Sequence, residues 1–532
     1  MKTSQNQRLQ IEGILKTINK QLINKEEAMR LALLASIAGE SIFFLGAPGT
    51  AKSLISRRLK SAFIGENNDE IKYFEYLMNQ FSTPDEVFGP VSLKSLEQDE
   101  YKRITAGYLP NADIAFLDEI WKASPAIQNT LLTIINERKF HNGNQVVNVP
   151  LKALVAASNE LPAQNQGLEA LWDRFLIRMV VKPVETDQDF KQLICGDDVV
   201  ADIEMDEKDL KNLISRKTLQ EWKIAIDEIK VPTDVLNVIL GIRKELALLN
   251  QEESRNINEH FYVSDRRWKK ITHLLKASAF LNGRQQVDLI DCQIIEYCIW
   301  NTENQIYEAK EIVRKIVQQN GLNASTMIDD VYTAINRFNK KIDSDFYKVD
   351  KSKYREVRMK DGNMAYELAE KSKISIGSTR SVEVKYIYNE GRTVAVYDEN
   401  KEQLMQSDYN GEFKIKNDTV SFLNTYHNIQ NKLKIIIEKE CLVKDNSIFS
   451  NKTVLAKLQE KADIEYEKIA AIIDKEYKKV IQLKEDRETY YTSNLFAGES
   501  MSDVISKTIA KSEIDLLKAK VDLDSAKQRY AK

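Results

Sequence analysis

The first stretch with recognisable chemistry joins an apolar run to a helical pattern. The apolar run is residues 42–45, and residues 54–63 follow with helical spacing, so a predicted strand leads through a loop into a predicted helix. In that context the backbone N–H groups of a glycine-bearing loop and the positive end of the helix can surround phosphate oxygens. A chance glycine-rich turn is the alternative. The loop consists of Gly46, Ala47, Pro48, Gly49, Thr50, Ala51, Lys52 and Ser53.

The end of this loop carries the polar side chains that phosphate chemistry needs. Lys52 can place a positive charge at the phosphate oxygens, and the Ser53 hydroxyl can bind Mg²⁺. Ala51 departs from the general pattern, which has glycine immediately before the lysine. We expect its small side chain to fit if the backbone stays out of the region that only glycine adopts.

Two adjacent carboxylates end the apolar stretch at residues 114–117. Because the strands of a parallel sheet present their carboxyl ends at the edge where ligands bind, we expect Asp118 and Glu119 there. Asp118 suits the Mg²⁺ shell, and Glu119 suits the orientation of an attacking water. A strand that ends in two acids is often only a solvated strand end, but its place after a phosphate loop favours the functional interpretation.

Three more polar residues are candidates for contact with a terminal phosphate. Asn159 ends a strand at 153–157 and is either such a contact or an ordinary strand cap. Arg174, between core-forming residues, could stabilise transition-state charge at a neighbouring subunit or could form a surface pair with Asp173. Arg266 and Arg267 stand in the first turn of a predicted helix, where positive charge opposes the helix dipole unless an anion lies nearby.

The charge balance argues against general affinity for nucleic acid. Of 532 residues, 77 are Lys or Arg and 80 are Asp or Glu, which gives a net charge of −3 and leaves room only for a local basic patch. The four cysteines form no CxxC pair, and the polar N-terminus has no apolar signal segment. Since no apolar run is long enough to span a membrane, we expect a cytoplasmic protein.

The order of predicted elements indicates the fold class and the domain organisation. We expect an α/β core with a parallel sheet and helices on both faces, an all-α lid, and a helical domain with a small β-rich insertion. An Asn-Gly pair at 142–143 predicts a hairpin, and residues 419–485 are interpreted as helix. The predicted domains are residues 1–190 (α/β), 191–305 (lid), 306–372 with 419–532 (helical) and 373–418 (β-rich).

The order of these motifs resembles that of AAA+ ATPases. In that resemblance the 46–53 loop is Walker A, Asp118 and Glu119 are Walker B, Asn159 is sensor 1, Arg174 is the arginine finger and Arg266 is sensor 2. The insertion before residue 114, with Gly-Tyr-Leu-Pro at 107–110, resembles the MoxR branch, as does the hairpin. The loop sequence, with alanine at position 51, is similar to the RavA (regulatory ATPase variant A) subfamily.

The resemblance implies further properties. They are ATP and Mg²⁺ as cofactors, a homo-hexameric ring with Arg174 acting in trans, and chaperone-like remodelling of protein partners. A protein with a von Willebrand factor A domain is the implied partner, and the β-rich insertion would dock other proteins. Arg266 is preferred over Arg267 because Ser-Asp-Arg at 264–266 resembles the family's Ser-Pro-Arg.

Two other functions fit part of the pattern. The first is a motor on nucleic acid, for which Lys139 and His141 on the predicted hairpin give slight support and the balanced charge counts against. The second is a nucleotide-gated scaffold with little hydrolysis. The presence of Glu119, Asn159 and the arginines favours hydrolysis over the scaffold.

Overall fold

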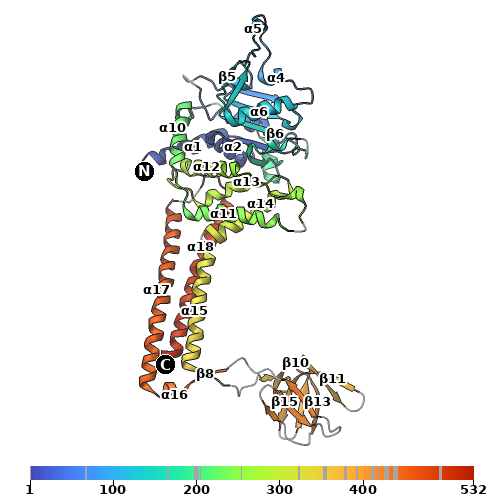
Figure 1. Cartoon of the computed structure of the whole chain (residues 1–532), viewed down its shortest axis with the longest axis vertical. Coiled ribbons are helices and arrows are strands. Elements are labelled where there is room, and N and C mark those ends of the chain that lie inside the picture. The colour runs from blue at the N-terminus through green and yellow to red at the C-terminus, as the bar shows by residue number, and fades with distance from the viewer. Residues whose placement is uncertain are drawn as a thin grey trace. The chain divides into compact units, whose positions relative to one another are not determined.

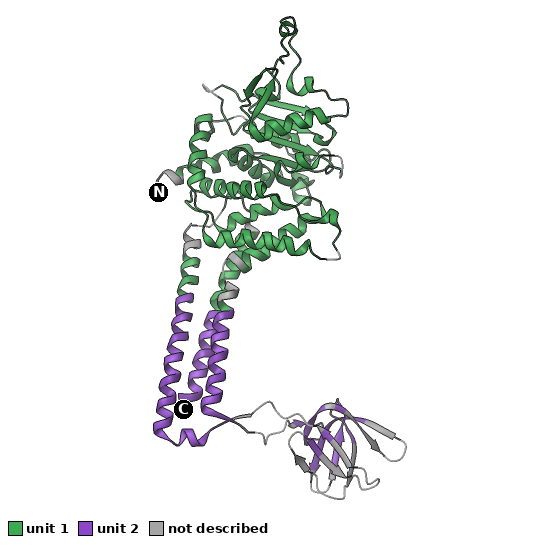
Figure 2. Ribbon diagram, viewed as in Figure 1, with its two compact units in different colours: residues 1–328, 477–515 green, residues 329–476, 516–532 purple. Residues whose placement is uncertain are grey.

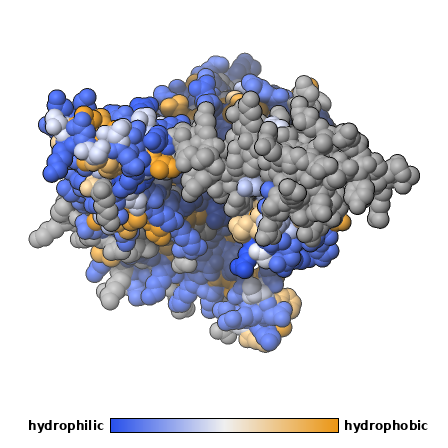
Figure 3. Space-filling view, turned by 90° about the horizontal axis from the view of Figure 1, so that it is seen from below, coloured by the Kyte–Doolittle hydropathy of each residue, from blue (hydrophilic) through white to orange (hydrophobic). Residues whose placement is uncertain are grey.

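The computed structural model forms two compact units (Figure 2), one of residues 1–328 and 477–515, the other of residues 329–476 and 516–532. In these units no described helix is both long and apolar enough to cross a membrane. On the face drawn in Figure 3, hydrophilic residues cover most of the coloured surface. The structure describes residues 2–65, 69–163, 167–196, 203, 205–252, 255–321, 324–350, 356–376, 380–390, 393–408, 414–416, 419–423, 430–434, 441–490 and 494–531.

The first unit is built around a five-stranded sheet with the order β2-β3-β6-β1-β7. Every neighbouring pair is parallel, and all residues of β1 and β6 are buried, because helices cover both faces of the sheet (Figure 1). The predicted parallel α/β core is therefore confirmed. The strands are β1 (Ser41–Leu45), β2 (Tyr73–Leu77), β3 (Ile114–Asp118), β6 (Ala153–Ser158) and β7 (Phe175–Val180).

Local sequence sets the ends of the helices around this sheet. Gly39 ends α2 with φ +72°, and Thr83 begins α4 through a capping box with Glu86. Pro125 takes the first position of α6, where its missing N–H costs nothing. The helices are α1 (Lys2–Ile18), α2 (Glu26–Ala38), α3 (Lys52–Lys60), α4 (Pro84–Phe88), α5 (Leu93–Leu96), α6 (Pro125–Glu137) and α7 (Glu169–Trp172).

The predicted hairpin is present and is held by the insertion before β3. Strand β4 (Lys139–Asn142) pairs with β5 (Gln145–Asn148), and Asn142 lies opposite Gln145. The Arg103 N–H donates to Asn142 Oδ1 at 2.6 Å, and Asn142 Nδ2 donates to the Arg103 carbonyl at 3.0 Å. A Cβ on Gly143 would lie 2.0 Å from the Tyr101 carbonyl oxygen, so only glycine allows this approach.

Helices continue after the sheet, as predicted for the lid. The first turn of α10 is capped by the Ser215 side chain and that of α12 by the Ser264 side chain. Helix α12 packs against both α10 and α2. The helices are α8 (Asp187–Cys195), α9 (Glu207–Asn212), α10 (Arg216–Glu228), α11 (Thr233–Leu249), α12 (Asp265–Leu281), α13 (Glu296–Ile299) and α14 (Asn304–Ile316).

A buried polar network ties a distant segment of the first unit to the lid. Asp291 has no exposed side-chain surface and pairs with Arg284 at 2.6 Å. It accepts hydrogen bonds from Ser278 Oγ at 2.7 Å and from Asn494 Nδ2 at 2.8 Å. The Gly498 N–H donates to Gln293 Oε1 at 2.9 Å. The segment at 494–498 is thus fastened to the lid by hydrogen bonds to the buried side chains of Asp291 and Gln293.

In the second unit, parts of three helices meet around Tyr530, which is 1% exposed. Its ring stacks on Phe346 with centroids 5.4 Å apart, and its hydroxyl donates to Asp463 Oδ1 at 2.8 Å. The predicted helical region thus has a packed aromatic centre. The helices are α15 (Ala324–Phe346), α16 (Asn446–Phe449), α17 (Lys452–Tyr490) and α18 (Glu499–Ala531).

Antiparallel strands form the predicted β-rich insertion. Strands β8 and β17 pair with each other, so the chain leaves the helices and returns to them through one two-stranded ladder. The others form sheets of order β13-β12-β11-β10-β9 and β14-β15-β16. They are β8 (Tyr347–Asp350), β9 (Glu356–Arg358), β10 (Met364–Ile376), β11 (Arg380–Glu390), β12 (Thr393–Tyr397), β13 (Gln403–Asp408), β14 (Lys414–Lys416), β15 (Thr419–Leu423), β16 (Gln430–Lys434) and β17 (Cys441–Lys444).

The helical interpretation of residues 419–485 is wrong at its beginning. The described residues between 419 and 444 form β15, β16 and β17, and helix α17 begins only at Lys452. Val420 is fully buried and lies opposite Leu433, whereas Thr419 and Ser421 alternate with it along the strand. Polar and apolar residues therefore alternate with a period of two, which is typical of a strand and not of a helix.

The Asp291 network leads to a stability prediction. Asp291→Ala leaves the Arg284 charge largely buried without its partner, which typically costs about 3–5 kcal/mol. We expect a large drop in the urea midpoint for the first unit, followed by circular dichroism on the full chain. As a control, Glu221→Ala breaks an exposed pair with Lys217 on α10 and should change stability by less than about 1 kcal/mol. Equal effects of the two substitutions would contradict the structural role of the network.

Candidate active site

The phosphate loop runs from β1 into α3 at the carboxyl edge of the sheet. A Cβ on Gly46 would lie 2.4 Å from the Val181 carbonyl oxygen, so the loop can leave the sheet beside β7 only with glycine there. Gly49 has φ +78°, another conformation that favours glycine. The Gly46 N–H donates to the Ser158 carbonyl at 3.1 Å, which fixes the start of the loop to the end of β6.

Lys52 lies inside the curve of this loop. Its side chain is 7% exposed, and its Nζ donates to the carbonyls of Gly46 at 2.7 Å and Ala47 at 3.0 Å. Burial lowers the pKa of Lys52, while the nearby Asp118 and Glu119 carboxylates oppose that shift. The ammonium group therefore stands between the loop and the two acids, where a phosphate could replace the carbonyls as its acceptor.

Ala51 has an unusual backbone. Its φ of +70° and ψ of 21° lie in the left-handed region, which glycine adopts freely and other residues adopt at a cost of about 1–2 kcal/mol. The sequence predicts that alanine fits here if the backbone stays out of the region that only glycine adopts. The structure shows that the loop keeps the left-handed turn and that alanine accepts the strain.

The two acids end β3 beside the loop. Asp118 Oδ1 accepts the Glu119 N–H at 3.0 Å, and burial raises the pKa of Asp118 while that hydrogen bond and Lys52 oppose the shift. Glu119 has φ +50°, a left-handed conformation that is uncommon for its type and typical of strained functional positions. Its Oε2 lies 3.3 Å from Lys122 Nζ and accepts a hydrogen bond from Ser158 Oγ at 3.3 Å.

Ser158 is a contact that the sequence analysis did not single out. It is fully buried at the end of β6, opposite Leu45 of β1. Its carbonyl binds the phosphate loop and its hydroxyl binds Glu119, so one residue joins both motifs. The exposed Asn159 follows directly, at the same edge. The only signal in the sequence was the polar pair at the end of an apolar strand.

A pocket of about 310 Å³ lies at this edge beside the end of β7, whose neighbour Val181 brings its carbonyl close to Gly46. It is bounded by the segment before α2, which includes Asn24 and Lys25, and by the end of β7 with Val181, Lys182 and Pro183. Lys25 Nζ donates to the Lys182 carbonyl at 2.8 Å, and burial lowers the pKa of Lys25. Helix α2, which precedes the strand before the loop, thus flanks this cavity through Glu27 and Ala28.

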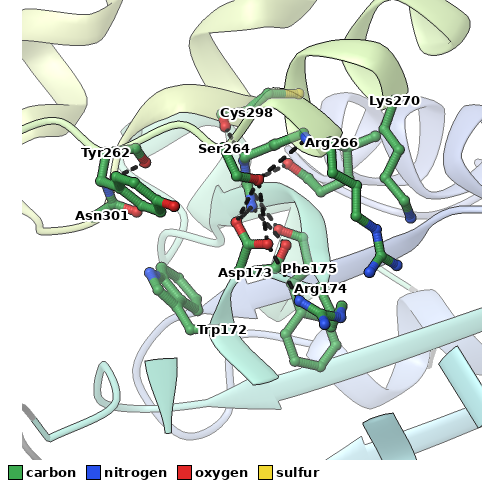
Figure 4. Close-up of polar contacts among 12 residues, drawn as sticks. Trp172, Asp173, Arg174, Phe175, Tyr262, Ser264, Arg266, Lys270, Cys298 and Asn301 are labelled. Atoms are coloured by element: carbon green, nitrogen blue, oxygen red, sulfur yellow. Dashed lines mark hydrogen bonds and ion pairs between the residues drawn. The ribbon is translucent and has the colours of Figure 1, made fainter. Parts of the chain in front are cut away.

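Arg174 and Arg266 lie at the opposite edge of the same sheet (Figure 4). Arg174 directly precedes β7, whose Phe175 pairs with Ser41 at the start of β1. The phosphate loop follows the end of β1, and a five-residue strand spans about 17 Å. Arg174 Nη1 lies 3.3 Å from Asp173 Oδ2, and its pKa is lowered by burial and by Arg266. The structure thus groups the two arginines with each other and not with Lys52 of the same chain.

Arg267 is a structural residue. It is 2% exposed, and its guanidinium donates to four backbone carbonyls, those of Asp173, Phe175, Leu176 and Cys298, at 2.6–3.0 Å. Burial lowers its pKa. Arg266, one residue earlier, is exposed and donates to Asn136 Oδ1 of α6. Of the two arginines, only Arg266 is available to a ligand.

Comparisons with known proteins identify the family. Residues 8–222 match the model of the MoxR domain of MoxR-vWA-beta-propeller ternary systems, and residues 234–317 match an AAA lid domain. The chain belongs to the MoxR family of AAA+ ATPases.

Two similar proteins from one organism each match more than half of this chain. The chain is 37% identical to the uncharacterized protein MJ0079 of Methanocaldococcus jannaschii over 310 residues, 58% of this chain and 75% of that protein. It is 35% identical to MJ0812 of the same organism over 334 residues, 62% of this chain and 83% of that protein. The chain also resembles the crystal structure of a Cytophaga hutchinsonii protein, with 17% identity and a TM-score of 0.45. The match covers 60% of this chain and 96% of that one, and it is too distant to add to the assignment.

The strained Ala51 gives a second prediction. Ala51→Gly relieves the left-handed strain, which is partly offset by the greater freedom of glycine in the unfolded chain, so the first unit should gain roughly 0.5–1 kcal/mol. The measurement is the urea midpoint without nucleotide. The control is Ala47→Gly in the same loop, where φ is not positive and the substitution should destabilise. A loss of stability in Ala51→Gly equal to that in Ala47→Gly would show that the backbone is not strained.

Proposed function

We propose that the chain hydrolyses ATP at sites shared between neighbouring subunits of a ring and uses the energy to remodel protein partners. One observation carries this proposal. The phosphate loop with its acids lies at the carboxyl edge of the sheet, and the two candidate arginines lie at the amino edge, about 17 Å away along β1. A site that needs both sets of residues is complete only when two chains meet.

The donor set at the carboxyl edge fits a nucleotide with Mg²⁺. Lys52 and the N–H groups of residues 46–53 would hold the phosphates, and the Ser53 hydroxyl with the Asp118 carboxylate would hold the ion. No cluster of three or more potential metal-binding His, Cys, Asp or Glu side chains occurs in the described part of the chain, which suits an ion held mainly by one carboxylate, a hydroxyl and the substrate. When bound, Mg²⁺ supplies neutralisation of the phosphate charge.

Glu119 is our candidate for orienting the attacking water. Its strained backbone, the Ser158 hydroxyl and Lys122 fix the direction of the carboxylate. Asn159, at the end of the neighbouring strand, is the candidate contact for the terminal phosphate or the water. The cavity beside Lys25 and Pro183 is our candidate for the nucleoside, because Val181 in its wall approaches Gly46 and its volume is about 310 Å³.

Arg174 and Arg266 are our candidates for stabilising transition-state charge on the nucleotide of the neighbouring subunit. They lie on one surface, and Arg266 contributes to the lowered pKa of Arg174. The two positive charges are therefore close enough to interact with the same anion. Arg174 also pairs with Asp173, and an anion placed between the two guanidinium groups would interact with both cations. The exposure of Arg266 and the burial of Arg267 support Arg266 as the candidate.

The partners are proposed from the family. The matched model describes MoxR domains of systems with vWA and beta-propeller proteins, so a protein with a von Willebrand factor A domain is our proposed partner. We also propose a homo-hexamer, the RavA subfamily, a cytoplasmic location and a docking role for the β-rich insertion. The division at residues 190, 305, 372 and 418 likewise stays a prediction.

Single substitutions test the catalytic roles. Lys52→Ala should abolish nucleotide binding, because the buried ammonium is lost from the phosphate loop. Glu119→Gln should bind ATP and retain it, and Arg174→Ala should bind ATP but lose roughly 10³–10⁵ in turnover. The measurements are fluorescent-nucleotide binding and steady-state phosphate release. Full turnover by Glu119→Gln would remove that residue from the mechanism.

A mixing experiment tests the shared site. Rings made only of Lys52→Ala subunits or only of Arg174→Ala subunits should be inactive. In a mixed ring, some sites combine the intact phosphate loop of an Arg174→Ala subunit with the intact arginine of a Lys52→Ala subunit. With random assembly in equal amounts, about a quarter of all sites are of this kind. We therefore expect phosphate release to return to about a quarter of the unmodified rate. The matched control mixes Lys52→Ala with Glu119→Gln, whose defects lie in the same half, and should stay inactive. No recovery in the first mixture would contradict the shared site.

A further inference from the structure

Seven basic side chains of the first unit line a cavity that none of the proposed roles, apart from that of Arg266, uses. The cavity has a volume of about 740 Å³ and lies at the amino edge of the sheet, between the end of α2, the end of α6, and helices α10 and α12. Its walls carry seven basic side chains against the two carboxylates of Glu40 and Asp227. The basic residues are Arg138, Lys152, Arg216, Lys223, Arg266, Lys269 and Lys270.

Part of this charge is neutralised within the protein. Lys152 pairs with Asp113, and Lys270 pairs with Glu40. Asp227 lies 3.7 Å from His273, whose pKa is lowered by burial and by the neighbouring lysines 223 and 276. After these pairs are counted, the wall still holds an excess of cations in a chain whose net charge is −3.

Three of the remaining cations have no carboxylate within ion-pair distance among the residues that the structure describes. Arg138 Nη2 donates to the neutral Gly39 carbonyl at 2.7 Å, and its Nη1 is buried without a hydrogen-bond partner among the described residues. Arg266 donates to the neutral Asn136 amide, and Lys269 is exposed on the next turn of α12. Burial lowers the pKa of Arg138, which shows that its charge is poorly solvated. An anion in the cavity would relieve this imbalance.

We propose that this basic pocket binds a phosphate-bearing small polyanion. Several cations that converge on one concave surface with low-dielectric walls raise the local concentration of anions. The ligand is either the nucleotide of a neighbouring subunit or a free polyphosphate compound, because both present the same row of phosphate oxygens. A nucleic acid is a poorer fit, since the basic residues gather around one cavity of about 740 Å³ and do not form an extended track.

The test uses inorganic tripolyphosphate and the full chain with Lys52→Ala, so that the phosphate loop does not compete. Titration calorimetry at low salt should show one saturable site that weakens as salt increases. Introducing Lys223→Gln and Lys269→Gln into the Lys52→Ala protein should raise the Kd for tripolyphosphate roughly tenfold or more, because two charge-assisted contacts are lost. Both positions are exposed, so the substitutions should not affect folding. The control removes two other exposed charges of the lid, Arg243 and Lys244 on α11, and should leave the Kd unchanged.

Three results would overturn the proposal. One is the absence of saturable binding to the Lys52→Ala protein at low salt, and another is an equal loss of affinity in the pocket variant and the α11 control. Tighter binding of a short single-stranded oligodeoxythymidylate than of tripolyphosphate, lost in the same pocket variant, would also overturn it and would assign the surface to nucleic acid.

A second arm distinguishes the two sources. Unmodified protein is saturated with a non-hydrolysable ATP analogue and titrated with tripolyphosphate. If the neighbour's nucleotide occupies the pocket, the site seen with Lys52→Ala disappears, whereas a site for a free polyanion keeps its stoichiometry. Both results are consistent with a polyanion site in the basic pocket. Neither depends on hydrolysis, so failure of the proposed ATPase activity and failure of this inference are separate outcomes.

Discussion

The direction of β1 is the constraint on which the rest of the structure depends. In a parallel sheet each strand begins at one edge and ends at the other, so a residue before β7 and a loop after β1 lie a full strand length apart. That length is about 17 Å for five residues, more than an arginine side chain spans. A chain of this topology presents the loop at residues 46–53 at one edge and Arg174 with Arg266 at the other.

Buried arginines keep the amino edge rigid. Arg267 binds four carbonyls around the start of β7. Arg178 binds the carbonyls of Trp172 and Phe175, and its guanidinium lies 3.8 Å from the centroid of the Trp172 ring. The two side chains fix the segment that carries Arg174. An arginine whose position is set by such a frame is pre-organised, so little entropy is lost when it meets a ligand. The frame therefore supports our assignment of Arg174 to charge stabilisation, and the exposed Arg266 shares its surface.

The carboxyl edge was more predictable from the sequence than the amino edge. Gly46–Ser53 and Asp118–Glu119 are contiguous motifs that each end an apolar strand, so their meeting follows from the rule for parallel sheets. The strain of Ala51 and the hydroxyl of Ser158 depend on backbone angles and on a neighbour far along the chain, which no local pattern encodes. The burial of Arg267, the exposure of Arg266 and the basic cavity arise where α6, α10 and α12 meet, so they required the tertiary structure. The strands after residue 419 were missed because short alternating segments carry a weak signal beside long helical ones.

Our central claim is that the active site is divided between chains. The direct test is the specific ATPase rate as a function of protein concentration, with the mass of the assembly measured in the same samples. If residues from two chains complete the site, the rate per subunit falls to background as dilution separates the subunits, and it rises in step with the assembled fraction. A rate per subunit that stays constant down to the monomer would contradict the account, because a single chain would then hold every group that hydrolysis needs.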